Sequence, residues 1–236
     1  MAEDDFRTTR WSLVLAAGGA GRQANHALEW LCEAYWYPLY AYVRRRGHDP
    51  DRAADLTQGY FVDLLERRFF EGVDPAAGKF RAFLLVTLKN YLSKERTREQ
   101  AAKRRADNPV FLVSLEDAER RYSAEPGHER SPELLFERHW AATVLARALQ
   151  RLDDEQDGAE KRAVYHRLKG YLTGDGGGSY VEAARGLSMT GGAIKVTVHR
   201  LRKRLGQLLR EEVSQTVSRA GDVDSEVRHL LQVSSE

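Results

Sequence analysis

The chain has 236 residues, 42% of them hydrophobic, which is enough for one large domain or two small domains with real cores. Its 37 basic and 35 acidic residues leave a net charge of only +2, so the overall charge predicts no class of partner. Cys32 is the single cysteine, which excludes a disulfide framework or a cysteine-rich zinc site within one chain. No stretch approaches the ~20 apolar residues of a membrane span, and Met1–Arg10 lacks the apolar core of a signal peptide. We therefore expect a cytoplasmic protein without a membrane partner.

Apolar residues recur every three or four positions along most of the chain, and this spacing predicts an all-α fold. In the N-terminal half it predicts helices at about residues 28–46, 50–65 and 80–105. The first ends at three arginines followed by Gly47, a usual C-terminal signal. Strand-like patterns are scarce; Val110–Leu115 is the best of them, and it is short.

Periodicity fades between residues 108 and 132, where prolines and acidic residues predict a linker with a short helix around Glu116–Arg121. A second helical block is expected from Pro132 to about Leu209, with a break at the glycine-rich residues 173–178. The apolar spacing between Val223 and Leu231 predicts one last amphipathic helix. The predicted architecture is two small helical domains joined by an acidic linker.

Positive charge is concentrated in two of the predicted helices. Residues 79–105 contain nine Lys or Arg and two acids, and residues 195–204 contain five Lys or Arg and no acid. Two basic helices on either side of an acidic linker indicate two places that meet phosphate groups.

The pattern between Tyr180 and Leu209 is typical of a helix-turn-helix. Residues 188–192 form the expected turn, and the next helix has an apolar stripe of Ile194, Val198, Leu201, Leu205 and Leu208. Such a helix enters the major groove, so residues off its stripe are candidates for DNA contact. Together with one turn residue, they are Thr190, Lys195, Thr197, His199, Arg200, Arg202 and Lys203. The alternative is an ordinary helical hairpin with a solvated basic face.

The basic helix that starts near Phe80 mixes aromatic and cationic residues, which can stack on unpaired bases and neutralise phosphates. Phe80 and Phe83 are expected in the core. The residues expected to contact DNA are Lys79, Arg81, Lys89, Asn90, Lys94, Arg96 and Arg98. The alternative is that the aromatic residues are all core and the cations are only solvated.

The helix over residues 49–66 is half polar and half apolar, which is usual for a surface helix and also suits docking of a partner helix. The candidates for partner contact are Asp51, Asp55, Leu56, Gln58, Phe61 and Asp63.

Motifs of catalysis are lacking, so we expect no enzyme activity, no cofactor and no small-molecule substrate. The run at residues 176–179 has neither the lysine nor the preceding strand of a phosphate-binding loop, and neither HExxH nor GxSxG occurs. His199 has no His or Cys partner at ligand spacing, so no metal site is expected.

Taken in order, these segments resemble an extracytoplasmic-function (ECF) sigma factor of bacterial RNA polymerase, a minimal type with only the second and fourth conserved sigma regions. LYAYVRRRG at residues 39–47 followed by AADLTQ at 53–58 resembles the part of the second region that binds the polymerase clamp. FRAFLL at residues 80–85 and NYL at 90–92 resemble its promoter-melting, minus-ten-recognising part. YVEAA at residues 180–184 and GAIKVTVHRLRKRL at 192–205 resemble the fourth region, which recognises the minus-thirty-five element. TTRWSLV at residues 8–14 and the tail look like a longer ECF subgroup.

The resemblance implies a sigma region 2 over residues 8–107, a linker over 108–132, a helix-turn-helix region 4 over 133–210 and a tail over 211–236. It implies core RNA polymerase and promoter DNA as partners, and it leaves room for an anti-sigma or other regulatory protein. Two glycines depart from the family's pattern. Gly59 stands where the family usually has an acid that supports the clamp contact, and Gly191 stands where a Glu commonly opens the recognition helix.

Two other classes of function stay open. A transcription regulator could bind DNA through the helix-turn-helix without joining polymerase, and a sigma-like module could act only through protein contacts. The N-terminal half separates them, because a simple regulator has no need of the sigma-like segments at residues 39–58 and 80–98.

Overall fold

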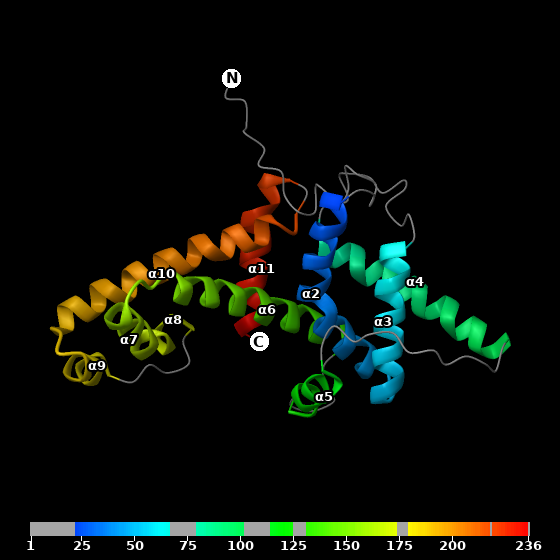
Figure 1. The fold of residues 1–236 in the computed structure, drawn as a ribbon, viewed down its shortest axis with the longest axis horizontal. Helices are drawn as coiled ribbons and strands as arrows, with labels where there is room; N and C mark the ends of the chain where they lie inside the picture. The colour runs from blue at the N-terminus through cyan, green and yellow to red at the C-terminus, as the bar shows by residue number, and fades with distance from the viewer. Residues whose placement is uncertain are drawn as a thin grey trace, which may run out of the picture. The chain divides into compact units, whose positions relative to one another are not determined.

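The computed structural model describes residues 22–66, 79–101, 114–124, 131–173, 179–217 and 219–235. Every regular element in these ranges is helical, and the only pairing of strand type within them is an isolated bridge between Lys79 and Val217 (Figure 1). The elements are α2 (Arg22–Arg45), α3 (Pro50–Glu66), α4 (Phe80–Ala101), α5 (Leu115–Ser123), α6 (Pro132–Asp154), α7 (Ala159–Leu168), α8 (Gly170–Thr173), α9 (Tyr180–Gly186), α10 (Gly191–Ser214), η1 (Ala220–Asp222) and α11 (Val223–Ser235). The predicted all-α fold is confirmed for this part of the chain. None of these helices combines the length and apolar character needed to cross a membrane.

The predicted helices of the N-terminal half are present as α2, α3 and α4, and the short helix predicted in the linker is α5. Gly47 follows α2 with a φ of 93°, the left-handed conformation that favours glycine at a helix end. The predicted strand-like segment and the predicted break at residues 173–178 fall largely or wholly outside the described residues.

The chain forms two compact units. The first unit consists of Met1–Thr143 together with Val213–Glu236, and the second consists of Val144–Glu212. The division therefore falls between Thr143 and Val144, inside α6, and not at residue 133 where the second domain was expected to begin. The linker helix α5 and the tail helix α11 both belong to the first unit.

The core of the first unit is rich in aromatic side chains. α2 and α3 pack side by side (Figure 1), and the rings of Trp36 and Tyr40 on α2 stack with centroids 5.3 Å apart. Phe80 at the start of α4 is fully buried, as predicted, and packs edge-on against Tyr35 at 5.1 Å. Phe83, also predicted as core, is half-buried. This packing fixes the position of α4 through its first turns.

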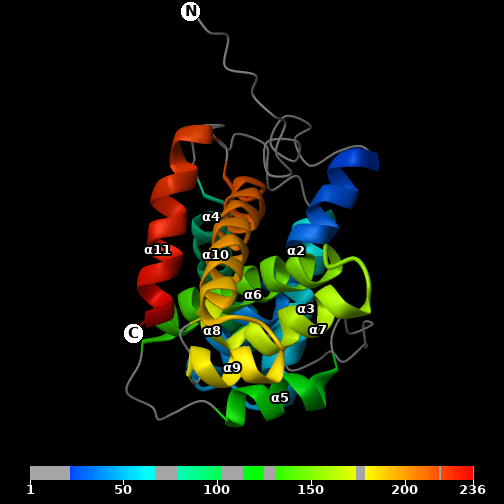
Figure 2. The same ribbon diagram turned by 90° about the vertical axis from the view of Figure 1, so that its left-hand side faces the viewer.

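The second unit contains the end of α6, the helices α7, α8 and α9, and α10 as far as Glu212. Both ribbon views place α9 beside the first residues of α10 (Figures 1 and 2). Tyr165 on α7 is buried and donates a hydrogen bond to the backbone carbonyl of Leu149 on α6 at 3.0 Å. This hydrogen bond joins α7 to α6 within the second unit.

Candidate nucleic-acid interface

A short turn joins α9 to α10 in the predicted helix-turn-helix. Ser188 has a φ of 51°, and the Met189 amide donates to the Ala184 carbonyl at 3.0 Å. Thr190 then caps α10, because its hydroxyl accepts a hydrogen bond from the Ala193 amide at 3.2 Å. This cap lets the helix begin at Gly191, so the turn is shorter than the predicted residues 188–192.

The inner face of α10 is the predicted apolar stripe. Its members are all buried: Ile194, Val198, Leu201, Leu205 and Leu208. The small side chains of Ala183 and Ala184 on α9 are also buried, at 1% and 9% exposure. The residues predicted to form the core of a helix-turn-helix are therefore buried.

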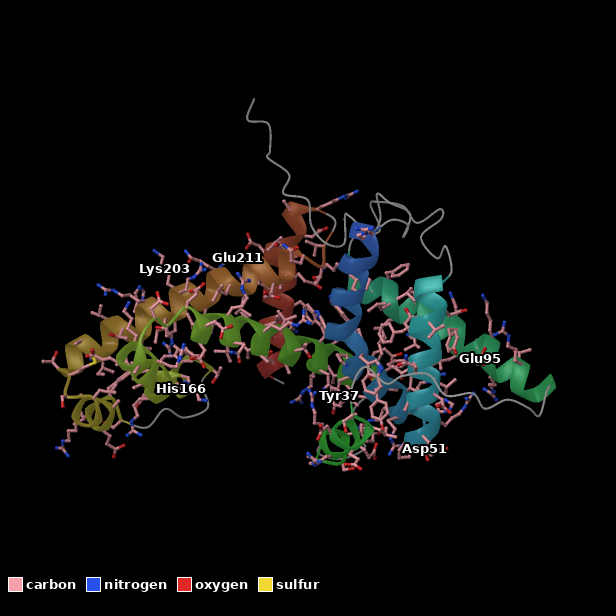
Figure 3. The ribbon with its side chains drawn as sticks, in the orientation of Figure 1. Tyr37, Asp51, Glu95, His166, Lys203 and Glu211 are labelled. Carbon is pink, nitrogen blue, oxygen red and sulfur yellow. The ribbon has the colours of Figure 1, made fainter. Side chains whose placement is uncertain are left out.

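The opposite side of α10 carries an exposed line of residues that we call the outer face: Val196, His199, Arg200 and Lys203. His199, Arg200 and Lys203 follow Val196 by three, four and seven positions. This spacing places all four residues on one side of a helix. Lys203 lies on the side of α10 away from α7 (Figure 3). Lys195 is exposed beside this line. Within the described ranges, no acidic side chain pairs with the cations of the outer face or with Lys195, so their charge is available to a ligand.

Three of the residues predicted to contact DNA on this hairpin have hydrogen-bond partners inside their own unit. Arg202 donates from Nη2 and Nε to the backbone carbonyl of Tyr171 on α8, at 2.6 and 3.1 Å. Thr197 is half-buried and donates to the Ala193 carbonyl at 2.9 Å. Thr190 uses its hydroxyl for the helix cap. The period of the helix places Arg202 and Thr197 on its flanks, where the hairpin itself supplies their partners.

Two of the residues predicted to contact DNA, Lys79 just before α4 and Arg81 in its first turn, belong to a buried ion-pair cluster. The Glu226 side chain on α11 is 1% exposed, and the Lys79 ammonium lies 2.6 Å from one of its oxygens. Arg81 pairs with both Glu226 and Glu137 of α6, and its side chain is only 12% exposed. In this structure Lys79 and Arg81 make packing contacts, because they neutralise a carboxylate that folding has removed from water, and their contact with DNA stays a prediction.

The rest of the basic surface of α4 divides into paired and open cations. Lys89 pairs with Glu133 at 2.9 Å, and Arg98 pairs with Glu95 at 2.7 Å; both cations are exposed, and both acids are half-buried. Asn90, Lys94 and Arg96 are exposed. Neither Lys94 nor Arg96 has an ion-pair partner in the described part of the chain. The surface of α4 that remains open to a ligand is defined by these three residues.

Half of the residues predicted to dock a partner on α3 lie in the core. Leu56, Gln58 and Phe61 are 2%, 7% and 1% exposed, because that side of α3 packs inside the first unit. They are corrected from partner contacts to core residues. Asp51 and Asp55 are exposed and Asp63 is half-buried; Asp51 lies at the start of the helix (Figure 3). An accessible acidic edge of α3 remains.

Gly59, one of the two departures from the sigma pattern, lies next to the hydroxyl group of Tyr91. A Cβ atom at this position would lie 2.5 Å from the hydroxyl oxygen of Tyr91 on α4. Burial raises the pKa of Tyr91 to about 12, so its hydroxyl stays protonated. The glycine therefore permits the close approach of α3 and α4, and no larger side chain fits without moving Tyr91.

The docking of α5 on α2 was not predicted from the sequence. Glu119 accepts hydrogen bonds from the Tyr40 hydroxyl at 2.6 Å and from Arg44 at 2.7 and 3.0 Å. Hydrogen bonding to Arg44 holds the pKa of the Glu119 carboxyl below its ordinary value. Arg121 stacks on the Tyr37 ring, 3.6 Å from its centroid. The alternation of acids and arginines on α5 was the only available signal, and it did not identify these partners.

The second unit also has a cavity of about 420 Å³ between α6, α7 and α8. Leu149, Asp153, Tyr165 and Lys169 are among its lining residues. Asp153 lies 3.5 Å from His166 and 3.8 Å from Arg162, so its carboxylate faces basic side chains of its own unit. Among the described residues, no cluster of three His, Cys, Asp or Glu side chains has the arrangement of a metal site.

Comparison with known proteins gives no relative from which a function could be transferred. No family model matches the chain, and neither the curated proteins nor the solved structures contain a match.

Proposed function

We propose that this chain is an ECF-type sigma factor that binds core RNA polymerase and directs it to promoters. In this proposal α10 recognises duplex DNA and α4 holds the strand that opens. The acidic edge of α3 docks on the polymerase clamp.

The observation that carries the proposal is the outer face of α10. Its cations are exposed and have no acidic partner in the described residues, while the stripe on the other side of the helix is buried, as expected for the second helix of a helix-turn-helix. In this motif the second helix lies in the major groove, and its N-terminal residues face the base edges. Neutralising phosphates releases counterions, which favours binding at low salt.

The order of the other segments supports a sigma factor over a simple DNA-binding protein. The open cations Lys94 and Arg96 lie on a helix that precedes the helix-turn-helix, as the resemblance requires. Binding of unpaired bases there offsets an unstacking cost of a few kcal/mol, so strand opening needs no nucleotide chemistry. Asp51 and Asp55 lie one turn apart on α3 and suit a basic docking partner.

A regulator that binds DNA without joining polymerase is the second candidate. The burial of Leu56, Gln58 and Phe61 favours it, because it removes half of the residues expected to contact the clamp. The ion pairs of Lys79 and Arg81 favour it as well, because they reduce the cationic surface for opened DNA.

In vitro transcription separates the two candidates. Purified bacterial core polymerase is given genomic DNA fragments with and without the full chain, and the transcripts are sequenced. A sigma factor produces transcripts that start at defined positions only when the chain is present. Duplex binding by the chain without any chain-dependent start would support the regulator.

Charge reversal tests the docking edge. Asp51→Lys with Asp55→Lys is expected to abolish co-purification with core polymerase and chain-dependent transcription, while duplex binding by the chain persists. The matched control is Glu116→Lys with Asp117→Lys, which reverses two exposed acids at the start of α5 in the same unit. Unchanged co-purification of the α3 variant would contradict the assigned docking edge.

A further inference from the structure

The outer face of α10 begins with an apolar residue. Val196 is 51% exposed and lies on the side of the helix opposite the buried stripe. His199 and Arg200 follow it by three and four positions and Lys203 by seven, so they adjoin it on the same side of the helix. An exposed valine therefore precedes, on one side of the helix, a line of three residues that can carry positive charge.

Neither folding nor helix stability accounts for a valine at this position. Its β-branched side chain is a poorer helix former than Ala, Lys, Glu or Gln. With half of its surface exposed, it contributes less to the core than any member of the buried stripe. Exposed single apolar residues are common on protein surfaces, so exposure alone decides nothing. What distinguishes Val196 is its position on the basic outer face, at the end of that face nearest the N-terminus of α10.

We infer that Val196 contacts the C5-methyl group of a thymine in the major groove and so contributes to the sequence preference of α10. This inference rests on the proposed function, in that it requires α10 to bind duplex DNA. Val196 lies in the second turn of α10, near the N-terminal end that reaches base edges in a helix-turn-helix. Of the four bases, only thymine offers a methyl group there, and a valine side chain has no hydrogen-bonding atom with which to recognise anything else.

The probe is DNA selected by the protein itself. Duplexes that the full chain retains are recovered from a random-sequence pool, once with the chain alone and once with core polymerase present. Each thymine of the recovered duplex is then replaced in turn by uracil, which keeps the hydrogen-bonding edge and lacks the methyl group. The chain is expected to lose affinity about fourfold at one position, the value of one buried methyl-sized group.

The variant Val196→Ala removes the side-chain methyl groups and improves helix propensity, so α10 is not weakened. It is expected to bind the thymine duplex about fourfold less tightly and to be indifferent to uracil at the sensitive position. Val86→Ala is the matched control, because Val86 is 60% exposed on α4 in the other unit. That variant should keep the full sensitivity to uracil.

Each remaining outcome overturns a defined part of the inference. If Val196→Ala keeps its sensitivity to uracil, or if no thymine matters, Val196 does not contact a thymine although α10 still binds DNA. If Val196→Ala binds DNA normally and instead loses core polymerase, the valine contacts a protein. If no duplex is recovered in either format, α10 does not recognise duplex DNA, and the proposed function fails together with the inference.

Discussion

Arg81 and Glu226 form an ion pair although 145 positions of sequence separate them. The pair joins the first turn of α4 to the C-terminal helix α11, and the Phe80 amide donates to the Thr216 carbonyl beside it at 2.9 Å. Burial raises the pKa of the Glu226 carboxyl, but hydrogen bonds from Arg81 and Lys79 outweigh this effect and hold it below its ordinary value. The C-terminal helix is therefore part of the core of the first unit.

The first prediction concerns this buried charge. Glu226→Gln keeps the shape of the side chain but leaves Lys79 and Arg81 without one of their acids. The free energy of unfolding, measured by urea denaturation of the full chain, is expected to fall by about 3 kcal/mol, because removing one partner leaves buried charge uncompensated. Glu95→Gln is the control, since the cation that it leaves unpaired, Arg98, is exposed to water, and it should cause a much smaller change. Equal effects of the two substitutions would contradict a stabilising role for Glu226.

The second prediction concerns the glycine under Tyr91. Gly59→Ala is expected to lower the free energy of unfolding by about 1–3 kcal/mol, because the added Cβ displaces the tyrosine hydroxyl. Tyr91→Phe should relieve the clash, since the ring carbon behind the hydroxyl lies 3.7 Å from the added atom. Gly192→Ala is the control in open space, and it should stabilise α10 by up to about 1 kcal/mol. Additive effects of Gly59→Ala and Tyr91→Phe would show that the hydroxyl is not the obstacle.

The third prediction concerns pH. His139 is buried against the Tyr37 ring and faces Arg121 and Arg45, and burial followed by these two charges lowers its pKa to about 4. The unfolded chain binds a proton near pH ~6.5 that the folded chain does not bind until about pH 4. Its stabilising contribution is thus complete above pH ~6.5 and is lost as the pH falls toward 4, by up to about 3 kcal/mol.

His139→Gln should therefore reduce the difference in unfolding free energy between pH 7 and pH 5. His166→Gln, at an exposed position in the second unit, is the control and should leave that difference unchanged. If both variants keep the same difference in unfolding free energy between pH 7 and pH 5 as the original chain, His139 is not the cause of that difference.

The fourth prediction separates two arginines of α10. Arg200→Ala should weaken duplex binding and reduce the salt slope by about one, because it removes a phosphate contact. The thermal stability of the Arg200→Ala variant should not change. Arg202→Ala removes the same charge but also the bonds to the Tyr171 carbonyl, so it should cost about 1 kcal/mol of stability. Fluorescence anisotropy at several salt concentrations and thermal unfolding check the two effects, and a reversed pattern would exchange the roles assigned to these residues.

The fifth prediction concerns strand opening by α4. Lys94→Ala with Arg96→Ala should reduce permanganate reactivity of unpaired thymines on a fully paired promoter bound by polymerase and this chain. A promoter with a pre-opened bubble should recover part of the loss, because the unpairing cost is already met. Lys161→Ala with Arg167→Ala removes two exposed cations from α7 and should leave melting intact. Normal melting of paired DNA by the α4 variant would rule out this surface.

The sequence alone determined the local structure of this protein. The apolar spacing predicted the helices around Phe80 and Pro50, and it identified the buried stripe from Ile194 to Leu208. These features are local, because backbone hydrogen bonds link residues four apart and the helical period fixes which side chains share a face. The outer face of α10 is a consequence of the same period.

Only the tertiary structure decided which charges stay open to a ligand. In the sequence, Arg81 and Lys94 are equivalent cations of one basic helix, but Arg81 meets Glu226 of the tail and Lys94 meets no acid in the described residues. Leu56 and Phe61 similarly suited either a docking face or a core, and packing assigned them to the core. No helical period encodes such a choice, because the free energy of burying a charge or an apolar side chain depends on partners that only the folded chain brings together.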